Sequence, residues 1–380
     1  MIYLDNSATT YPKPPEVLRA VQNAVREYSF NPGRGGYRHS LKTSKKVYQA
    51  RETIRKFFNA PSVESVILTP GCTQSINMAV KGVLKNGDHV IISSLEHNAV
   101  VRPLHKLKEQ GKITYSIAEA APEDDEKTIQ NFRDSINQNT RMIICTHASN
   151  VFGFRLPVER LCALAHSYGI LFCLDAAQSA GILPIDMEEG RYDFVCCAGH
   201  KYLYGPMGIG LLITGKDITV DSLIEGGTGS VSSELTMPSF YPDKLEAGTL
   251  NIPGILGLEA GIQFVERNGI NNIYEKESHL INYLRDRIKD FRYLKIYENS
   301  NVDHFDVPLL AFSAKDTDSE SVANYLSEKY DIAVRGGLHC APTAHESMGT
   351  SMGGIVRIAP SVFTTQTDMN LLVNSLRKFR

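Results

Sequence analysis

The segment at residues 193–210, DFVCCAGHKYLYGPMGIG, places a lysine where lysines are uncommon. Lys201 follows the apolar run Phe-Val-Cys-Cys and precedes a turn that is rich in glycine. A lysine withdrawn from water deprotonates easily, and its free amine can then form a Schiff base with a carbonyl compound. Taken alone, the residue is better explained as an ordinary surface lysine, so the interpretation depends on the motifs around it.

A second apolar run, ILFCLD, ends at Asp175. A carboxylate that closes an apolar strand is a candidate partner for a cationic ring nitrogen, although an aspartate there can also simply cap a helix. Lysine and carboxylate together are the pair that pyridoxal 5′-phosphate (PLP) requires. The lysine holds the aldehyde, and the carboxylate keeps the pyridine nitrogen protonated so that the ring can accept electrons.

Other polar residues also stand where apolar runs end. The turn Thr69-Pro-Gly-Cys-Thr73 opens a helical segment, where free N–H groups and a threonine hydroxyl could bind an anion. A plain helix cap is the alternative, and no Gly-Lys-Ser/Thr follows as in a P-loop. Ligands of open α/β sheets bind at the carboxyl ends of strands. His97 is therefore a candidate for lying on a cofactor ring or moving protons, and Asn150 and Gln178 are candidates for contacting the ring. Ordinary loop residues with satisfied hydrogen bonds are the alternative for all three.

One cysteine differs in its setting from the other six. Cys340 lies in RGGLHCAP, between a Gly-Gly turn and Ala-Pro, which predicts a loop. Cationic neighbours, here Arg335 and His339, would favour the thiolate that attacks substrates. A buried loop cysteine is the alternative. Arg357, at the end of GGIVR, is a candidate for binding a substrate carboxylate through its planar guanidinium.

Composition excludes several classes of protein. A net charge of −2 gives no basic surplus for nucleic acid or anionic lipid. No apolar run approaches the ~20 residues that span a membrane, and the first residues do not form a signal peptide. The seven cysteines lie mostly in apolar runs and lack zinc spacing, so we expect no metal site and a reducing, cytoplasmic location.

The elements that position these residues follow from the pattern between residues 65 and 214. Apolar runs alternate there with helical periodicity, which predicts an α/β fold with a mostly parallel, seven-stranded sheet covered by helices on both faces. The seven runs are residues 65–69, 89–94, 113–118, 141–147, 170–175, 193–197 and 208–214.

We expect two domains, since 380 residues exceed one ordinary core. Residues 1–15 form an N-terminal arm and residues 16–255 a large PLP-binding domain. Within it, residues 226–253 form a long loop that is functional or makes an interface. Residues 256–380 form a small α+β domain, which can also pack with the N-terminal segment. Its pattern from about residue 293 is strand (307–314), helix (319–330), strand (332–337), strand (354–361) and helix (367–379).

These motifs, in this order, resemble the class V aminotransferase family of fold-type I PLP enzymes. Within it they are most similar to the group-II cysteine desulfurase and selenocysteine lyase branch. The resemblance runs from YLDNSATT to the last helix. It implies a homodimer that converts L-cysteine, or L-selenocysteine, to L-alanine with PLP. Sulfur would be held as a persulfide and passed to an acceptor protein or a small thiol, as in iron–sulfur cluster assembly.

The resemblance also implies a role for each motif residue. Lys201 would hold PLP, Asp175 its ring nitrogen, Gln178 and Asn150 ring oxygens, and His97 would stack on the ring; Cys72, Thr73 and His200 would contact the phosphate, joined by Thr249 of the other subunit; Cys340 would accept sulfur; Arg335, Arg357, Asn150 and Arg34 would contact the substrate.

Two residues depart from the family pattern. Ala198 stands where many desulfurases have a serine that donates to the phosphate, and Cys72 stands where threonine is common. Two alternatives stay open at this point. Another class V reaction, such as that of a lyase, epimerase or transaminase, would leave Cys340 incidental. A PLP-binding protein without turnover is the other.

Overall fold

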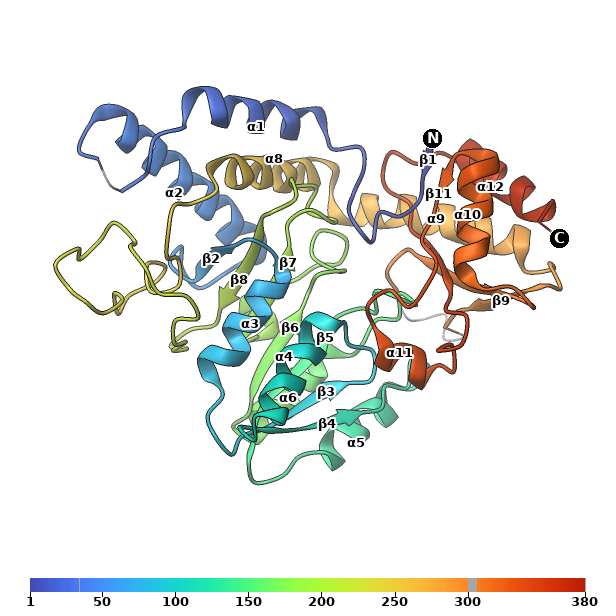
Figure 1. The fold of residues 1–380 in the computed structure, drawn as a ribbon, viewed down its shortest axis with the longest axis horizontal. Coiled ribbons are helices and arrows are strands. Elements are labelled where there is room, and N and C mark those ends of the chain that lie inside the picture. Colours follow the sequence, from blue (N-terminus) through green and yellow to red (C-terminus); the bar gives the residue numbers. More distant parts are fainter. Residues whose placement is uncertain (34, 300–305, 380) are drawn as a thin grey trace.

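The computed structural model describes residues 1–33, 35–299 and 306–379, and its centre is a seven-stranded sheet (Figure 1). The strands are β2 (Val66–Thr69), β3 (His89–Ser93), β4 (Thr114–Ala118), β5 (Thr140–Thr146), β6 (Leu171–Asp175), β7 (Phe194–Ala198) and β8 (Gly210–Thr214). Their order is β2-β8-β7-β6-β5-β3-β4. All pairs from β7 to β4 are parallel, and β8 alone runs antiparallel to its neighbours. The predicted sheet is confirmed, and each predicted run overlaps one strand to within a few residues.

Successive residues of the central strands enter two separate hydrophobic cores. Ile143 and Cys197 belong to the core on one face, whereas Ile144 and Cys196 belong to the core on the other. Side chains alternate across a strand, so a strand covered on both faces must be apolar throughout. All seven cysteines are free thiols, and six of them are buried.

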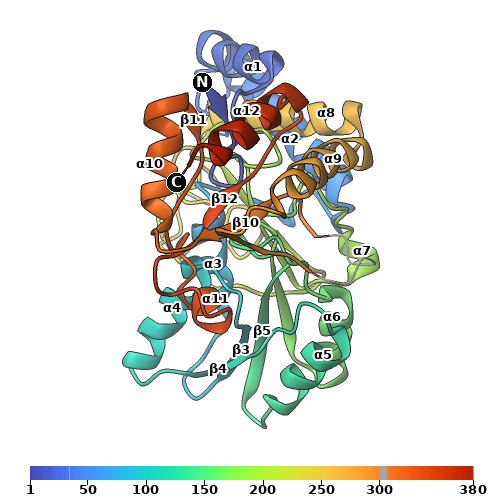
Figure 2. The same ribbon diagram turned by 90° about the vertical axis from the view of Figure 1, so that its right-hand side faces the viewer.

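Helices cover both faces of the sheet, and Figure 2 shows α3 and α4 on one side of the strands and α5 and α6 on the other. The helices of this part are α1 (Pro15–Glu27), α2 (Arg38–Phe58), α3 (Cys72–Val83), α4 (Asn98–Glu109), α5 (Asp125–Asp134), α6 (Val158–Ser167), α7 (Met187–Gly190) and α8 (Ile252–Asn268). In the part of the chain that the structure describes, no helix is long and apolar enough to cross a membrane.

A second, smaller sheet forms the C-terminal part. Its strands β9 (Leu294–Tyr297), β10 (Leu310–Ala314) and β12 (Val356–Ile358) are antiparallel in the order β12-β10-β9. Three helices share its hydrophobic core: α9 (Ile270–Ile288), α10 (Ser319–Tyr330) and α12 (Gln366–Arg377). Strand β9 and the short helix α11 (Pro342–Ser347) were not predicted.

One predicted strand of this part is shorter than expected. The run 332–337 supplies only β11 (Ile332–Ala333), which pairs in parallel with β1 (Ile2–Tyr3) and lies outside the small sheet. Gly337 follows with a φ of +109°, which an extended strand does not adopt. The N-terminal arm therefore packs against the C-terminal part, where Figure 1 also places the N-terminus.

The predicted domain boundary at residues 255–256 falls inside α8. This helix packs along α1 and α2. A domain boundary after α8 would keep these three helices in one domain. The organisation of the chain into two domains stays a prediction.

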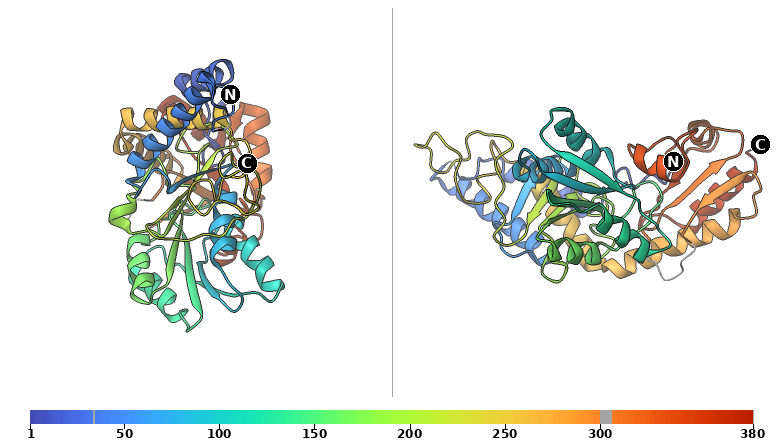
Figure 3. Two further views of the ribbon diagram at one scale, coloured as in Figure 1. Left: turned by 90° about the vertical axis from the view of Figure 1, so that its left-hand side faces the viewer. Right: turned by 90° about the horizontal axis from the view of Figure 1, so that it is seen from below.

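The segment between β8 and α8 contains no helix or strand, as predicted, and it projects from the end of the molecule opposite the C-terminal elements (Figures 1 and 3). A buried ion pair anchors it. Arg51 of α2 donates from Nη1 to Glu246 Oε1 at 2.8 Å, and its Nη2 donates to Oε2. Arg51 also donates to the Val66 carbonyl at 2.5 Å, and Glu246 accepts the Leu68 N–H at 2.6 Å. This pair therefore fixes the segment to α2 and β2.

Replacing Glu246 with alanine would leave the Arg51 charge buried without its partner. Breaking a buried pair in this way costs about 3–5 kcal/mol. We expect Glu246→Ala to lower the free energy of unfolding by that amount, measured by denaturant titration. Glu27→Ala, which breaks the exposed pair Arg26–Glu27, is the control and should cost less than about 1 kcal/mol. Equal losses in the two variants would show that the ion pair does not anchor the segment.

Candidate active site

The predicted site residues gather at one edge of the large sheet. Because β2, β3, β5, β6 and β7 all run in the same direction, their carboxyl ends meet there. The residues at or just beyond these ends are Cys72 and Thr73 after β2, His97 after β3, Asn150 after β5, Asp175 and Gln178 at the end of β6, and His200 and Lys201 after β7.

Lys201 and Asp175 influence each other's charge at the centre of this group. Burial lowers the pKa of Lys201, against the opposing effect of Asp175, and the charge of Arg357 lowers it further. Burial raises the pKa of Asp175, although the Ala177 N–H donates to its Oδ1 at 2.9 Å and Lys201 favours its charged form. Cys72 also donates from Sγ to Asp175 Oδ1 at 3.5 Å. The arrangement provides an amine that deprotonates easily and a carboxylate held in place beside it.

Two histidines of the group are uncharged at neutral pH. His97 caps α4, and its Nδ1 accepts the Ala99 N–H at 3.0 Å, so the neutral ring carries its proton on Nε2. Burial and the nearby charge of Lys201 lower the pKa of His97 to about 4. Burial likewise lowers the pKa of His200 to about 4. The main-chain oxygen of His200 accepts a hydrogen bond from Lys13 Nζ at 2.6 Å.

The two predicted amide side chains are each half satisfied. Asn150 donates from Nδ2 to the His339 carbonyl at 2.8 Å, and Gln178 donates from Nε2 to the Ser7 carbonyl at 3.1 Å. Their oxygens, Asn150 Oδ1 and Gln178 Oε1, are buried without a hydrogen-bond partner. Each amide therefore has one free acceptor for a ligand.

Arg357 is almost fully buried, with 1% of its surface exposed. Its Nη2 donates to Asp5 Oδ1 at 2.7 Å and its Nη1 to the Asn150 carbonyl at 2.6 Å. Burial lowers the pKa of Arg357, and the charge of Asp5 opposes this effect. The Nε has no partner. A substrate carboxylate would therefore compete with Asp5 for this guanidinium. The contact between Asp5 and Arg357 was not predicted from the sequence.

Cys340 is the exposed cysteine among the seven and lies in a loop, as predicted. The Asn98 N–H donates to the Cys340 carbonyl at 2.7 Å, which places this loop beside the β3–α4 turn. The Arg335 carbonyl accepts the Arg357 N–H at 2.9 Å. The predicted cationic role of His339 is wrong, because burial lowers the pKa of His339 to about 3 and leaves the ring neutral.

Other predicted residues take more peripheral places. Thr73 is exposed in the first turn of α3. Thr249 is exposed in the segment between β8 and α8, and no hydrogen bond joins it to the group around Lys201 within the described residues. Ala198 is buried at the end of β7. Arg34 lies outside the described residues.

Sequence reasoning missed the contribution of the N-terminal arm. Asp5 pairs with Arg357, Ser7 accepts from Gln178, and Thr10 donates from Oγ1 to the Lys201 carbonyl at 2.7 Å. The polar residues of YLDNSATT could have indicated this role, because a polar segment that packs against a buried site can supply hydrogen bonds to it.

Glu96, immediately before His97, was also missed. It is fully buried, and burial raises its pKa to about 8. Its Oε1 accepts hydrogen bonds from Ser93 Oγ at 2.5 Å and from the Thr146 N–H at 2.7 Å. Glu96 therefore joins the ends of β3 and β5 directly behind His97.

The unpartnered atoms give a direct test of whether PLP fits. Asn150 Oδ1, Gln178 Oε1, His200 Nδ1 and Arg357 Nε are all buried without partners. Buried polar atoms without partners are costly in a folded protein, so a polar ligand is expected to satisfy them. Together with Lys201 and Asp175, they fit a polar ring compound that carries an anionic group. No group of three metal-ligating side chains occurs in the ranges that the structure describes.

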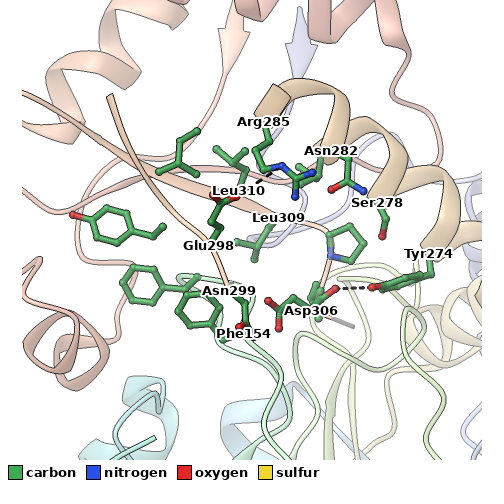
Figure 4. Close-up of a pocket in the computed structure, with 16 residues that line it drawn as sticks. Phe154, Tyr274, Ser278, Asn282, Arg285, Glu298, Asn299, Asp306, Leu309 and Leu310 are labelled. Atoms are coloured by element: carbon green, nitrogen blue, oxygen red, sulfur yellow. Dashed lines mark hydrogen bonds and ion pairs between the residues drawn. The ribbon is translucent and has the colours of Figure 1, made fainter. Parts of the chain in front are cut away.

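A separate cavity of about 440 Å³ lies between α9, β9, β10 and the segment containing Phe152 and Phe154 (Figure 4). Tyr274 donates there to the Asp306 carbonyl at 3.1 Å, and Arg285 pairs with Glu298 at 3.8 Å. None of the predicted site residues lines this cavity. It is therefore distinct from the site around Lys201.

The chain is similar over its whole length to known proteins. Residues 2–372 match the family model for aminotransferase class-V. A probable cysteine desulfurase from Methanothermobacter thermautotrophicus is 32% identical, over 99% of this chain and 94% of the relative. A cysteine desulfurase from Wigglesworthia glossinidia brevipalpis is 31% identical, over 100% of this chain and 92% of the relative.

Solved structures agree with these relatives. The apo structure of a cysteine desulfurase from Thermococcus onnurineus NA1 superposes with a TM-score of 0.90 at 26% identity, covering 100% of this chain and 94% of that one. A cysteine desulfurase from Escherichia coli gives a TM-score of 0.87 at 27% identity, covering 99% and 94%. The sheet, the order of the motifs and these similarities agree, and the chain belongs to the aminotransferase class-V family, with its fold-type I architecture.

Proposed function

We propose that this protein is a PLP-dependent cysteine desulfurase that converts L-cysteine to L-alanine and forms a persulfide on Cys340. The observation that carries the proposal is the position of Cys340. Its thiol is exposed, and its carbonyl accepts a hydrogen bond from the turn that holds His97. An exposed cysteine on a loop that is hydrogen-bonded to the His97 turn fits sulfur removal better than the other reactions of the family, because only sulfur removal needs a protein thiol. The names of the relatives support the same activity.

The residues around Lys201 would hold the cofactor. Lys201 would bind its aldehyde, Asp175 would keep its ring nitrogen protonated, and neutral His97 would lie against the ring. Gln178 and Asn150 would contact ring oxygens, whereas Cys72, Thr73 and His200 would bind the phosphate. When bound, PLP supplies an electron sink for negative charge on the substrate Cα.

The chain's own groups would carry out the remaining steps. Arg357, Arg335, Asn150 and Arg34 would orient the substrate carboxylate. The Lys201 amine, whose pKa burial lowers, can remove the Cα proton, and His97 is the alternative base. The Cys340 thiolate attacks the substrate sulfur, so that an S–S bond forms and the C–S bond breaks. The electron pair of that bond stays with the substrate, whose Cβ takes up a proton and whose Cα regains the one that was removed, which gives alanine. An exposed loop could then present the persulfide to an acceptor.

We also propose that two copies of the chain form the working enzyme and that Thr249 of each reaches the other's phosphate site. Thr249 is exposed and stands apart from the group around Lys201 of its own chain. The same end of the molecule exposes apolar side chains at helical spacing, Leu18 and Val25 on α1 and Leu41 and Tyr48 on α2. Exposed apolar surface of this kind marks an interaction site.

Lys201 is expected to be the residue that binds PLP covalently. Borohydride reduction followed by peptide mapping should place the cofactor on Lys201, and Lys201→Ala should bind PLP only without a covalent bond. Lys13 provides a matched control, because burial lowers its pKa to about 8 and it contacts the His200 carbonyl. Lys13→Ala should keep the covalent link. Cofactor found on Lys13 in the wild-type protein would contradict the assignment.

The proposed dimer should appear in sedimentation at twice the chain mass of 42.1 kDa. Tyr48→Glu places a charge on the exposed apolar surface and should shift the protein towards monomer, with loss of PLP retention. Leu371→Glu, at an exposed position on α12, should change neither. A wild-type protein that is monomeric at micromolar concentration would rule out the shared site.

Cys340→Ser tests the desulfurase activity itself. The variant should retain PLP, yet release alanine from cysteine at least about 100-fold more slowly, as loss of a nucleophile implies. Turnover of selenocysteine should survive in part, because selenium leaves more readily. Cys162→Ala, which removes a buried thiol in α6, is the control and should remain active. If Cys340→Ser released alanine from cysteine at the wild-type rate, the result would favour a lyase or a transaminase instead.

A further inference from the structure

We propose that the Asn150 side chain positions the loop that carries Cys340 and couples this loop to the ligand in the site. The proposal depends on the proposed function only for the use made of the Cys340 thiol. Its basis is the hydrogen bonds of residues 335–341. Some of them join the loop to the small sheet, and others join it to the turns that carry the proposed cofactor- and substrate-binding residues.

The first of these sets joins the loop to β12 and the residue before it. The Arg357 N–H donates to the Arg335 carbonyl at 2.9 Å, and the Ile355 N–H donates to the Gly337 carbonyl at 3.2 Å. The His339 ring returns a hydrogen bond from Nε2 to the Ile355 carbonyl at 3.1 Å. The small sheet therefore holds the first half of the loop in a way that does not depend on a ligand.

The opposite side is held at two consecutive carbonyls. The His339 carbonyl accepts from Asn150 Nδ2 at 2.8 Å, and the Cys340 carbonyl accepts from the Asn98 N–H at 2.7 Å. The second donor belongs to the main chain at the start of α4 and cannot turn away. The first is a side-chain amide, so of these two contacts it is the one that can change by rotation about a side-chain bond.

The loop needs these contacts because its backbone is strained. His339 and Cys340 have φ values of +48° and +56°, a left-handed conformation that residues other than glycine seldom adopt. Such a conformation persists only where the surroundings hold it. Loss of the Asn150 hydrogen bond should therefore release the two residues at the thiol.

Asn150 also faces the site. It is 7% exposed, and its Oδ1 is buried without a partner. Its carbonyl accepts from Arg357 Nη1 at 2.6 Å, which ties it to the proposed carboxylate-binding residue. A ligand group that donates to Oδ1 would fix the amide with Nδ2 towards His339. A ligand group that accepts from Nδ2 would draw it away from the loop. In either case, binding of a ligand changes the hydrogen bond between Asn150 and the His339 carbonyl and therefore the conformation of the loop at Cys340.

Hydrogen exchange in the full-length, PLP-loaded protein tests the first part of the proposal. In Asn150→Ala, the main-chain amides of residues 337–341 should exchange at least about threefold faster than in the wild type, because the loop opens more often. Exchange in β6 and α12 should stay unchanged, which separates a local effect from a general loss of stability. Asn150→Asp, which keeps the size of the side chain but removes the donor, should behave like Asn150→Ala.

Gln178→Ala is the matched control. Gln178 is also a buried amide with an unpartnered oxygen and a predicted contact to the cofactor, but it donates to Ser7 in the N-terminal arm. Its replacement should leave exchange at residues 337–341 within about twofold of the wild type. Equal acceleration in Gln178→Ala, or no acceleration in either Asn150 variant, would overturn the proposal.

A saturating concentration of L-alanine, the product of the proposed reaction, tests the coupling. Alanine should change exchange at residues 337–341 in the wild type and in Gln178→Ala, and it should have no effect there in Asn150→Ala. A response that persists in Asn150→Ala would show that another contact couples ligand to loop. None of these measurements requires turnover, so they stand apart from the Cys340→Ser assay, and that assay can fail while the loop contact holds.

Discussion

The partial withdrawal of the Lys201 amine from water, beside the buried Asp175, is the constraint that the rest of the site depends on. A charged amine and a charged carboxylate are both costly to bury. Burial therefore lowers the pKa of Lys201 and raises the pKa of Asp175, which favours the neutral form of each. A sheet covered on both faces offers an edge where such groups can be enclosed yet reached by a ligand. The continuous apolar strands β6 and β7 provide that edge, and they end at these two residues or just before them.

The N-terminal arm completes this edge from outside the sheet. Its first residues pair with β11, its Asp5 balances the buried charge of Arg357, and its Thr10 holds the Lys201 carbonyl. Arg357 itself lies on β12 of the small sheet. The site is therefore built where the beginning, the middle and the end of the chain meet, so that the two sheets and the arm depend on one another for its electrostatic balance.

The sequence allowed the large sheet to be predicted because each of its strands is a run of apolar residues, and most site residues could be placed because they follow those runs. Contacts between distant segments could not be found in this way. The Asp5–Arg357 pair joins residues far apart in the chain, and neither carries a local pattern that names the other. Strand β9 was missed because LKIY is short and only partly buried. The charge of His339 was misjudged because it depends on burial, which adjacent residues do not reveal.

The structure separates two kinds of support within one site. Lys201, Asp175 and His97 stand on strand ends and a helix start, where the sheet fixes their main chain and where a planar ring would need fixed partners. Cys340 stands instead on a strained loop, and several of the hydrogen bonds that hold this loop involve side chains, among them that of Asn150. Attack on a substrate sulfur and delivery of a persulfide require the same thiol to occupy two places. A rigid strand end could not supply both, whereas a loop can whose thiol-bearing residues are held by a single side-chain amide and one main-chain N–H.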